Sequence, residues 1–426
     1  SRGEEYENEK EGVVFVLGAG NFSAPIEILT KMFLEKKVVI YKPNPVNGKV
    51  TVPIYNYIFS SLIRDGYFTL FEGGIEESGK MINDDNVKEV MITGSDKTYD
   101  AIVWGAPRDE EEQKRRKREG EKQVSKQVDA ELGNINTASI IPGKYTKKEI
   151  KKMADHLAHV RVLNGSHTCP SPQILLIDKE WEQKDEFKEE MKKSLSSHLP
   201  IPCYYPGTQQ KYNTFKEAYP SGQTCPYSGK APVPAQGYLE PLFVSNIEQD
   251  ANLFLNLETF CPVMGVYEME VEGEAERVET FCKQATEFVN ERTWGNLATT
   301  IFSSSHTMSS HLPTIEEMVA KLHVGSIGVN IWGGTCVFFP QFRWGGYPGN
   351  TPEDIQSGSG RGVGNFLVYD GVKKSVLWSP LNHDLVTVSP TSPAQARKEG
   401  MRLAEFNTTQ SYFSLVKVVS AMYFGI

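Results

Sequence analysis

The sequence predicts an α/β protein in which a parallel sheet is covered by helices. Short apolar runs alternate with helical patterns through the first hundred residues, which is the order of repeated βαβ units. These runs are continuously apolar, as expected for strands that are buried on both faces. The 426 residues, 39% hydrophobic and 23% charged, suffice for a large core in two or three domains.

The elements of this first part follow from their periodicity and their flanking residues. Strands are predicted at 13–18, 38–42, 69–74 and 87–95, and helices at 25–36 and 52–66. In such sheets, ligands lie beyond the carboxyl ends of the strands, where the chain turns into the next helix. The turns to examine are therefore GAGN at 18–21, KPNP at 42–45 and TGSD at 93–96.

Each of these turns carries a modest binding signal. GAGN has Ser23 where a dinucleotide fingerprint has its third glycine, so an ordinary strand-to-helix turn is the first interpretation. Lys42 ends a buried strand, where a lysine must extend to the surface or meet an anion. Thr93, Gly94 and Ser95 lie at a predicted helix N-terminus, which is a ready anion site.

The next part of the chain begins with a dense run of both charge signs at 107–128. We expect a solvated insertion, helical in part, rather than a nucleic-acid patch or a nuclear signal. Strands follow at 138–141 and 173–177, with a helix at 146–163 between them.

The helix at 146–163 has a clear start and one apolar face. Thr146 and Glu149 have the spacing of a capping box. His156 and His159 have no ligand spacing with Cys169, and we expect both histidines at the surface.

Composition and charge argue against several partners and settings. The net charge of −9 and the pI near 5.6 argue against nucleic acid as the main partner. Six cysteines without a C-x-x-C pair indicate neither a zinc site nor a disulfide scaffold, so the cytoplasm or another reducing intracellular compartment is expected. No apolar run approaches the roughly 20 residues that span a bilayer, and no signal peptide opens the chain. Because the sequence begins at Ser1 rather than Met, we expect its upstream part to be missing or processed.

Cys169 ends the polar stretch NGSHTC at 164–169, between the predicted helix and the next strand. A lone cysteine is most often a small buried hydrophobe, since free cysteines are among the most buried side chains. The alternative interpretation is a nucleophile. The motifs in the rest of the chain distinguish a buried hydrophobic cysteine from a nucleophilic one.

Six short motifs occur along the chain in a fixed order. They are Asn21-Phe22, Lys42-Pro43, Thr93-Gly94-Ser95, Glu131-Leu132-Gly133, Asn164 to Cys169 to Pro172, and Glu258 to Phe260 to Pro262. The segments 290–304, 324–330 and 357–361 follow them. Each motif is weak alone, but in this order they resemble the aldehyde dehydrogenase superfamily over about residues 13–380. Variants such as LGAGN and ELGN are similar to a divergent branch of that superfamily.

The resemblance implies a catalytic set of three residues. Cys169 is expected to be the nucleophile that attacks an aldehyde carbonyl, with its thiolate favoured by backbone amides. Asn21 would donate its side-chain NH₂ to the oxyanion, beside the backbone N–H of Cys169. Glu131 would then act as the general base that activates water to hydrolyse the thioester, as a carboxylate with a raised pKa can.

The same resemblance implies NAD or NADP as the cofactor and no metal. Lys42 would bind the adenosine ribose and Ser95 the pyrophosphate, with Thr93 and Gly94 in the same turn. NAD-preferring members of the family have an acidic residue three positions after the lysine, which holds the ribose 2′-OH. This chain has Pro45 there, so no carboxylate at that position would repel the 2′-phosphate of NADP.

On the nicotinamide side, the resemblance implies that Glu258 binds the ribose and that Phe260 packs near the ring. Two glycines that are usual in the family are replaced, by Tyr99 after T-G-S and by Asn134 after E-L-G. These replacements put the pose of the cofactor and the mobility of Glu131 in doubt.

The resemblance also implies a division into domains. We expect a coenzyme-binding domain at 1–132 with the charged insertion inside it, a catalytic domain at 133–355, and a C-terminal return segment with a helical tail at 356–426. Family members carry a long N-terminal segment, with part of the coenzyme domain and one arm of the oligomerisation hairpin. We expect that segment to be missing here.

The expected function is NAD(P)-dependent oxidation of an aldehyde to a carboxylate through a thiohemiacetal and a thioester on Cys169. Two alternatives stay open: an acylating relative that passes the acyl group to or from coenzyme A, and a non-catalytic structural or assembly subunit. Glu131 favours hydrolysis over acyl transfer, because transfer to coenzyme A needs no base for water. The expected partners are a small aldehyde and further copies of the chain, in a dimer or tetramer.

Overall fold

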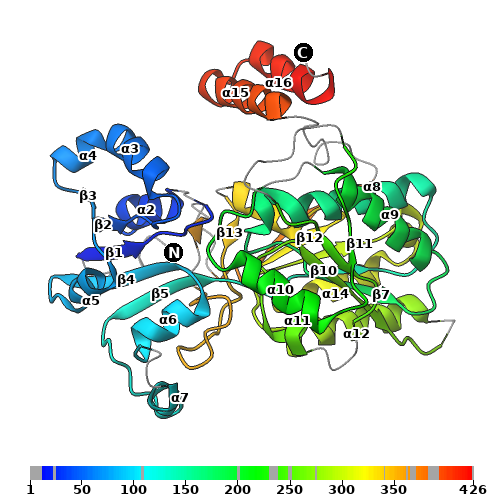
Figure 1. Cartoon of the computed structure of the whole chain (residues 1–426), viewed down its shortest axis with the longest axis horizontal. Helices are drawn as coiled ribbons and strands as arrows, with labels where there is room; N and C mark the ends of the chain where they lie inside the picture. The colour runs from blue at the N-terminus through cyan, green and yellow to red at the C-terminus, as the bar shows by residue number, and fades with distance from the viewer. Residues whose placement is uncertain are drawn as a thin grey trace.

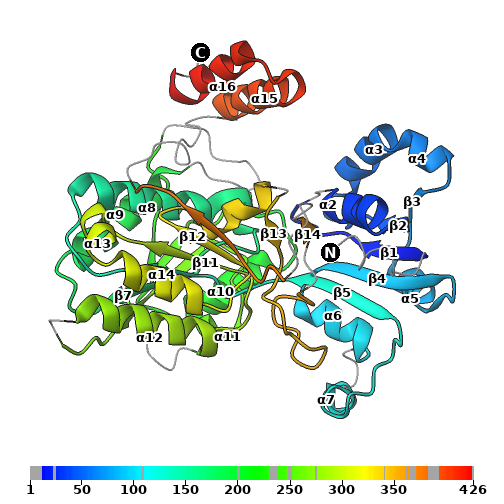
Figure 2. The same cartoon turned by 180° about the vertical axis from the view of Figure 1, so that it is seen from behind.

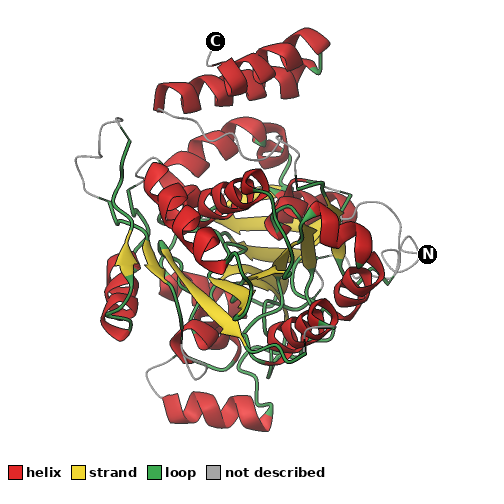
Figure 3. Cartoon of the chain, turned by 90° about the vertical axis from the view of Figure 1, so that its right-hand side faces the viewer, coloured by secondary structure: helices red, strands yellow, loops and turns green. Residues whose placement is uncertain are grey.

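The computed structural model describes residues 12–22, 25–106, 110–198, 202–229, 238–247, 252–273, 276–339, 341–360, 363–364, 371–381 and 393–424. Within these ranges the strands form a five-stranded, an eight-stranded and a two-stranded sheet. The two larger sheets lie side by side, and helices flank the strands on both faces (Figures 1 and 3). The α/β class predicted from the sequence is confirmed.

The first sheet is parallel throughout, with the order β3-β2-β1-β4-β5. Its strands are β1 (Val13–Leu17), β2 (Val38–Lys42), β3 (Phe68–Leu70), β4 (Val87–Gly94) and β5 (Gln127–Leu132). The four strands predicted up to residue 95 are confirmed, although β3 is shorter than expected. Because the strand order reverses between β1 and β4, a crevice for a ligand forms beyond their carboxyl ends.

The helical segments of this half are α2 (Ile26–Leu29), η1 (Thr30–Leu34), α3 (Gly48–Ile58), α4 (Ser60–Arg64), α5 (Ile75–Asn83), α6 (Asp96–Val103) and α7 (Glu110–Glu119). The helix predicted at 25–36 changes into a π-helical turn, η1, where Lys31 and Met32 are buried. The helix predicted at 52–66 begins earlier and breaks at Phe59, which packs against Phe68 with ring centroids 4.9 Å apart. The charged helix α7 buries none of its residues, which confirms a solvated helix within the insertion predicted at 107–128. Residues 107–109 lie outside the described ranges, and residues 127–128 belong to β5.

The eight-stranded sheet has the order β15-β12-β11-β6-β7-β10-β9-β8, parallel except for the pair β8 and β9. Its strands are β6 (Thr137–Ile140), β7 (Ile174–Asp178), β8 (Gln223–Thr224), β9 (Leu242–Val244), β10 (Val263–Met269), β11 (Ala298–Phe302), β12 (Ser326–Val329) and β15 (Ser375–Trp378). Along β7, Ile174 and Leu176 join one apolar cluster and Leu175 and Ile177 another. The sheet is therefore buried on both faces.

Helices that accompany the second sheet are α8 (Lys147–Val162), α9 (Lys184–Ser197), α10 (Thr208–Ala218), α11 (Asn252–Asn256), α12 (Arg277–Glu291), α13 (Ser305–Ser310) and α14 (Leu312–Lys321). The capping box predicted for α8 is confirmed, because Glu149 N donates to Thr146 Oγ1 (3.2 Å) and Thr146 N donates to Glu149 Oε2 (2.8 Å). The surface position expected for His156 is wrong. Its ring is buried, and its Nε2 accepts a hydrogen bond from Trp332 N (2.9 Å). Burial lowers the pKa of His156 to about 3, which suits this acceptor role.

A segment from far along the chain covers the β5 edge of the first sheet. Leu132 N donates to Ser357 O (3.0 Å), and Ser359 N donates to Ala130 O (3.0 Å). The same region holds the two-stranded sheet of β13 (Arg343–Trp344) and β14 (Val363–Gly364), beside β5 (Figure 2). The two larger sheets are thus tied together next to the strand that carries Glu131.

The helices α15 (Pro393–Thr409) and α16 (Tyr412–Phe424) pair as a hairpin that stands apart from both large sheets (Figures 1 and 2). The helix predicted at 394–406 is confirmed as part of α15. Across the described ranges, every helix is too short or too polar to cross a bilayer.

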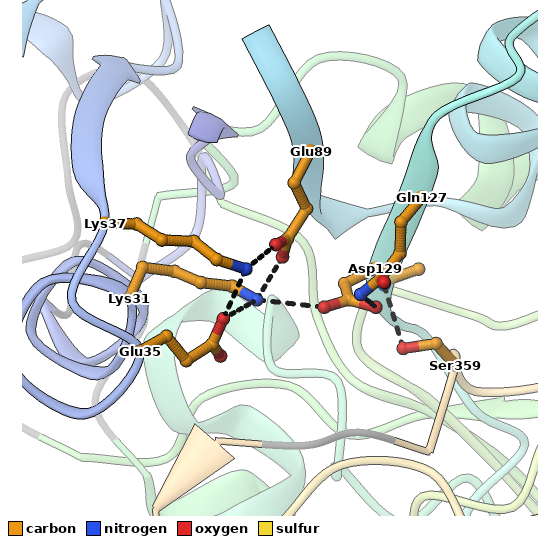
Figure 4. Close-up of polar contacts among 8 residues, drawn as sticks. Lys31, Glu35, Lys37, Glu89, Gln127, Asp129 and Ser359 are labelled. Carbon is orange, nitrogen blue, oxygen red and sulfur yellow. Dashed lines mark hydrogen bonds and ion pairs between the residues drawn. The ribbon is translucent and has the colours of Figure 1, made fainter. Parts of the chain in front are cut away.

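A buried ion network fastens η1 to the strands β4 and β5 (Figure 4). The Nζ of Lys31 lies 3.0 Å from Glu35 Oε2 and 2.9 Å from Asp129 Oδ2, and it also contacts Glu89. Lys37 adds contacts to Glu35 (2.9 Å) and Glu89. Lys31, Glu89 and Asp129 are each at most 4% exposed. Removing one cation from such a network leaves buried carboxylates without their partner.

Lys31→Met is therefore expected to lower the free energy of unfolding by about 3–5 kcal/mol, because breaking a buried ion pair leaves an uncompensated charge. The matched control is Lys80→Met, which removes an exposed pair with Glu76 (2.8 Å, side chains 72% and 78% exposed). That change is expected to cost about 0.5 kcal/mol or less. Chemical unfolding of both variants measures the difference, and equal effects would contradict the role given to Lys31.

Candidate active site

Two cavities open at the carboxyl ends of the first sheet and share one wall. The switch-point cavity, of about 420 Å³, lies where β1 and β4 end. The tryptophan cavity, of about 370 Å³, takes its name from Trp332 and Trp344, which line it. The residues that line both cavities are Ala19, Asn21, Thr93, Glu131 and Cys169.

All nine site residues predicted from the sequence line the switch-point cavity. They come from the turn after β1, the ends of β2 and β4, the residue before α6, the end of β5, and the loops before β7 and β10. They are Asn21, Lys42, Thr93, Gly94, Ser95, Glu131, Cys169, Glu258 and Phe260. Motifs that are far apart in the sequence therefore meet in one space.

A tight turn after α8 brings Cys169 to the shared wall. Its backbone has three consecutive residues in the left-handed region, Asn164 (φ 53°), Gly165 (φ 64°) and Ser166 (φ 70°). Glycine adopts this region freely and asparagine tolerates it, whereas most residues do not. The Nδ2 of Asn164 donates to Asn21 O (2.9 Å) and to His167 O (3.3 Å). The turn is thereby attached to the loop that follows β1.

His167 anchors the other side of this turn. Its ring nitrogens contact Asn164 O (3.1 Å) and Thr208 Oγ1 (2.8 Å), and its ring stacks on Tyr205 with centroids 5.5 Å apart. Burial lowers the pKa of His167 to about 4, so the imidazole is neutral near pH 7. These contacts give His167 a structural role beside the site.

Cys169 is held in place by its backbone. Its carbonyl accepts a hydrogen bond from Asn136 Nδ2. The expectation that backbone amides favour its thiolate needs correction, because burial and then the charges of Glu131 and Glu258 raise the pKa of Cys169 well above its usual value. The backbone hydrogen bond acts in the expected direction but is outweighed. At rest the side chain is a thiol.

Glu131 lies near the end of β5 and is 7% exposed. Its Oε1 accepts a hydrogen bond from the indole Nε1 of Trp344, 213 residues further along the chain. Burial, followed by the charge of Glu27, raises the pKa of Glu131 to about 8, although the bond from Trp344 acts against this. A carboxyl group with this pKa can exchange a proton near neutral pH.

Glu258 approaches the backbone of the E-L-G turn closely. Asn134 N donates to Glu258 Oε1 (3.3 Å), and a Cβ at position 133 would lie 2.6 Å from either carboxylate oxygen of Glu258. A side chain at position 133 would therefore displace the carboxylate of Glu258. Burial raises the pKa of Glu258 to about 7, and the charge of Lys211 opposes that shift. Lys211 also lies 5.8 Å from the ring centre of Phe260.

The turn that follows β4 is arranged as predicted at a helix N-terminus. Ser95 is the N-cap of α6, and its Oγ accepts a hydrogen bond from Thr98 N (3.2 Å). Lys42 and Asn44 line the cavity beside it. Pro45 is exposed and is not among the described residues that line the cavity.

The two replaced glycines are accommodated away from the open space. Tyr99 is 2% exposed and packs with Leu132 and Ile355 under α6. The side chain of Asn134 is buried and donates to Asn136 Oδ1 (2.8 Å) and Ala298 O (2.9 Å). Neither side chain is among the described residues that line the switch-point cavity.

Several residues of the site were not predicted. Glu27 lines the tryptophan cavity and accepts a hydrogen bond from Thr93 Oγ1 (2.9 Å), and burial raises its pKa. Lys211 and Trp344 contact Glu258 and Glu131 from distant segments. No local pattern in the sequence marks these three residues, because their role comes from tertiary proximity. Among the described residues, no group of three His, Cys, Asp or Glu side chains could hold a metal ion.

The arrangement can add a thiol to a carbonyl group beside a nucleotide-type ligand. Cys169 supplies the nucleophile, Asn21 supplies an amide donor, and Glu131 supplies an acid or base. The switch-point cavity lies where parallel α/β sheets of this order bind dinucleotides.

Comparisons with known proteins agree with this arrangement. The sequence model of the aldehyde dehydrogenase family matches residues 12–364. Among solved structures, the chain is similar to a γ-glutamyl-γ-aminobutyraldehyde dehydrogenase from Burkholderia cenocepacia, with a TM-score of 0.62 and 20% identity over 83% of this chain and 65% of that one. It is also similar to a succinic semialdehyde dehydrogenase from Streptococcus pyogenes in complex with NADP⁺, with a TM-score of 0.57 and 19% identity over 83% of this chain and 70% of that one.

A Mycobacterium tuberculosis aldehyde dehydrogenase in complex with NAD⁺ gives a TM-score of 0.58 and 16% identity over 83% of this chain and 66% of that one. The chain thus spans about two thirds of the length of these proteins. At such identities the structural likeness shows the fold. A comparison with curated protein sequences finds no significant match.

The electrostatics of Cys169 lead to a prediction about its reactivity. At pH 9 the ionised Glu131 disfavours the thiolate, so Glu131→Gln is expected to lower the pKa of Cys169 and to speed its alkylation by iodoacetamide. The alkylation rate is expected to rise about threefold to tenfold, since one pKa unit changes the thiolate fraction about tenfold. Mass spectrometry of the Cys169 peptide gives the rate, with the exposed Glu272→Gln as control. Equal alkylation rates in both variants would show that Glu131 does not influence the pKa of Cys169.

Proposed function

The chain belongs to the aldehyde dehydrogenase family, and from that premise we propose that it oxidises an aldehyde to a carboxylate with NAD or NADP as hydride acceptor. The observation that supports the proposal is the wall shared by the two cavities. Cys169, Asn21 and Glu131 line the switch-point cavity on one side and the tryptophan cavity on the other. Covalent catalysis by a thiol needs this position between the cofactor and the aldehyde.

The first step forms a bond between Cys169 Sγ and the carbonyl carbon. The thiol proton is released to solvent, and the electron pair of the carbonyl double bond moves onto its oxygen. The Asn21 side chain donates one N–H to His167 O (3.0 Å), and an amide NH₂ has a second hydrogen for that oxyanion. As the oxyanion collapses, a hydride leaves the carbon, and a bound nicotinamide would supply its acceptor. A thioester on Cys169 remains.

The second step releases the product by hydrolysis. Glu131, with its pKa raised to about 8, takes a proton from the water that attacks the thioester carbon. The C–S bond breaks, the carboxylic acid leaves, and Glu131 returns its proton to the Cys169 sulfur, which recovers the thiol. Trp344 holds the carboxyl group of Glu131 at the shared wall through its indole N–H.

The residues of the switch-point cavity fit a dinucleotide. The turn at 93–95 stands at the N-terminus of α6, where backbone N–H groups favour a pyrophosphate. Lys42 would hold the adenosine ribose, Glu258 the nicotinamide ribose, and Phe260 would pack near the ring. The backbone at Gly20 comes close to Asn44, since a Cβ there would lie 2.7 Å from Asn44 Oδ1.

The adenosine end of this cavity supports use of NADP as well as NAD. Among the described residues that line the switch-point cavity, the carboxylates are Glu131 and Glu258. Both belong to the part of the cavity assigned to the nicotinamide. A carboxylate beside the ribose would reject a 2′-phosphate through like-charge repulsion. Pro45 supplies none, and Lys42 is a cation. We therefore assign dual cofactor use to this site.

The two alternative functions receive less support. Glu131 beside Cys169 favours hydrolysis of the thioester over transfer to coenzyme A. The convergence of all nine predicted residues opposes a purely structural role. We assign a coenzyme-binding domain to residues 1–132 and a catalytic domain to 133–355, with 356–426 as the return segment and tail, and residues of the first two line the site together. Assembly into a homodimer or homotetramer stays a prediction.

Glu131→Gln is expected to separate the two steps. Acylation survives in the variant, so mixing with aldehyde and cofactor should give a burst of about one NAD(P)H per site, followed by turnover that is at least about 100-fold slower. In the wild type, hydrolysis should speed up as the pH rises through about 8, because the base must be ionised. Stopped-flow absorbance at several pH values measures both effects. Unchanged steady-state turnover would exclude Glu131 from the reaction.

Pro45→Glu tests the cofactor assignment. The wild type should bind NAD and NADP with dissociation constants within about tenfold of each other, since no carboxylate faces the 2′-phosphate. A carboxylate at position 45 should weaken NADP binding by about tenfold or more and leave NAD binding nearly unchanged. Fluorescence titration of both proteins gives the constants. Tight NAD binding by the wild type, with no NADP binding, would show that another acidic group occupies the position.

A further inference from the structure

The tryptophan cavity has a lining that differs from that of the switch-point cavity. Its walls are mainly apolar and include Phe22, Leu163, Trp332, Val337, Phe338 and Trp344. Its volume of about 370 Å³ lies near the lower end of the range for small-molecule sites, about 300–1,000 Å³. Such a space suits one ring or an alkyl chain of medium length.

The two tryptophans form fixed apolar walls. Trp332 Nε1 donates to Pro170 O (2.8 Å), next to the nucleophile, and Trp332 N donates to the buried His156 (2.9 Å). Trp344 Nε1 donates to Glu131. Because both indole N–H groups already have partners within the protein, the ring faces that remain for a ligand are apolar.

The ionisable groups in this lining are all acids. Among the described residues that line the cavity, the ionisable ones are Glu27, Glu131 and Cys169, and no lysine, arginine or histidine occurs. An anionic substrate would lose its hydration there without gaining a cation as partner. Glu27 already accepts a hydrogen bond from Thr93 Oγ1 (2.9 Å).

Two aromatic side chains are solvent-exposed although they line the cavity. Phe22 is 55% exposed and Phe338 is 61% exposed. Covering an apolar ligand with exposed aromatic rings is favourable in free energy, since each ring that becomes buried removes a large apolar area from water.

From these observations, which rest on the proposed function, we propose that the substrate is a hydrophobic aldehyde without an anionic group, alkyl or aryl. Its apolar body lies in the tryptophan cavity, and its carbonyl group meets Cys169 at the shared wall. Aldehydes that carry a carboxylate are poor substrates.

The first experiment compares kcat/KM for hexanal and succinic semialdehyde under identical conditions. The value for hexanal should be at least about tenfold higher, because burying a charged group without a partner costs at least the free energy of a tenfold change. Equal values, or a preference for succinic semialdehyde, would overturn the assigned substrate class while leaving aldehyde oxidation intact.

The second experiment places a cation in the wall. Val337→Arg should lower kcat/KM for hexanal and raise it for succinic semialdehyde, so that their ratio falls at least about tenfold. The matched control is Val50→Arg on α3, where the side chain is 63% exposed. The control should keep the wild-type ratio. If Val337→Arg also kept the wild-type ratio, the apolar part of the substrate would lie outside the tryptophan cavity.

A binding measurement separates this inference from the proposed function. In Cys169→Ala, which cannot react, hexanal should change tryptophan fluorescence at a lower concentration than succinic semialdehyde. Trp332→Phe in the same background should reduce this signal. If hexanal binds in this way while no aldehyde is oxidised by the wild type, the substrate site stands and the proposed function fails. If hexanal neither binds nor reacts, the substrate class is wrong.

Discussion

The position of Cys169 depends on the left-handed turn at Asn164, Gly165 and Ser166. This turn reverses the chain after α8 and delivers the thiol to the wall between two cavities. The side chains of Asn21 and Asn164 then tie it to the loop after β1, because each amide donates to a carbonyl of the other segment. These hydrogen bonds join the loop after β1 of the first sheet to the turn before β7 of the second sheet. A side chain that could not adopt the turn would separate the nucleophile from both cavities.

Burial determines the chemistry once the residues are in place. It raises the pKa of Glu131, Glu258 and Cys169 together, and the like charges of these groups add to the effect on the thiol. The site therefore holds protons near neutral pH that it can transfer when a substrate arrives. The cost of keeping these groups out of water is offset by the rest of the fold, in which the network around Lys31 fixes β4 and β5.

Much of the fold and of the candidate site follows from local sequence patterns. Continuous apolar runs predicted the strands β1 to β4 of the first sheet but not β5, and Thr146 and Glu149 predicted the start of α8. The nine motif residues were predicted from their order and share one cavity. The burial of His156 and the bond from Trp344 to Glu131 could not be predicted, because each depends on segments more than 170 residues apart. The raised pKa of Cys169 was missed for the same reason, since it comes from burial and from the charges of Glu131 and Glu258, which lie on other segments of the chain.

The most direct measurement of the proposed chemistry is the mass of the Cys169 peptide after Glu131→Gln protein is mixed with an aldehyde and cofactor and quenched in acid. The peptide is expected to gain the mass of the acyl group, which is the aldehyde less one hydride and one thiol proton, in an amount equal to the NAD(P)H released. Cofactor reduction without an adduct on this peptide, or with the adduct on another cysteine, would contradict the assignment of Cys169 as the nucleophile.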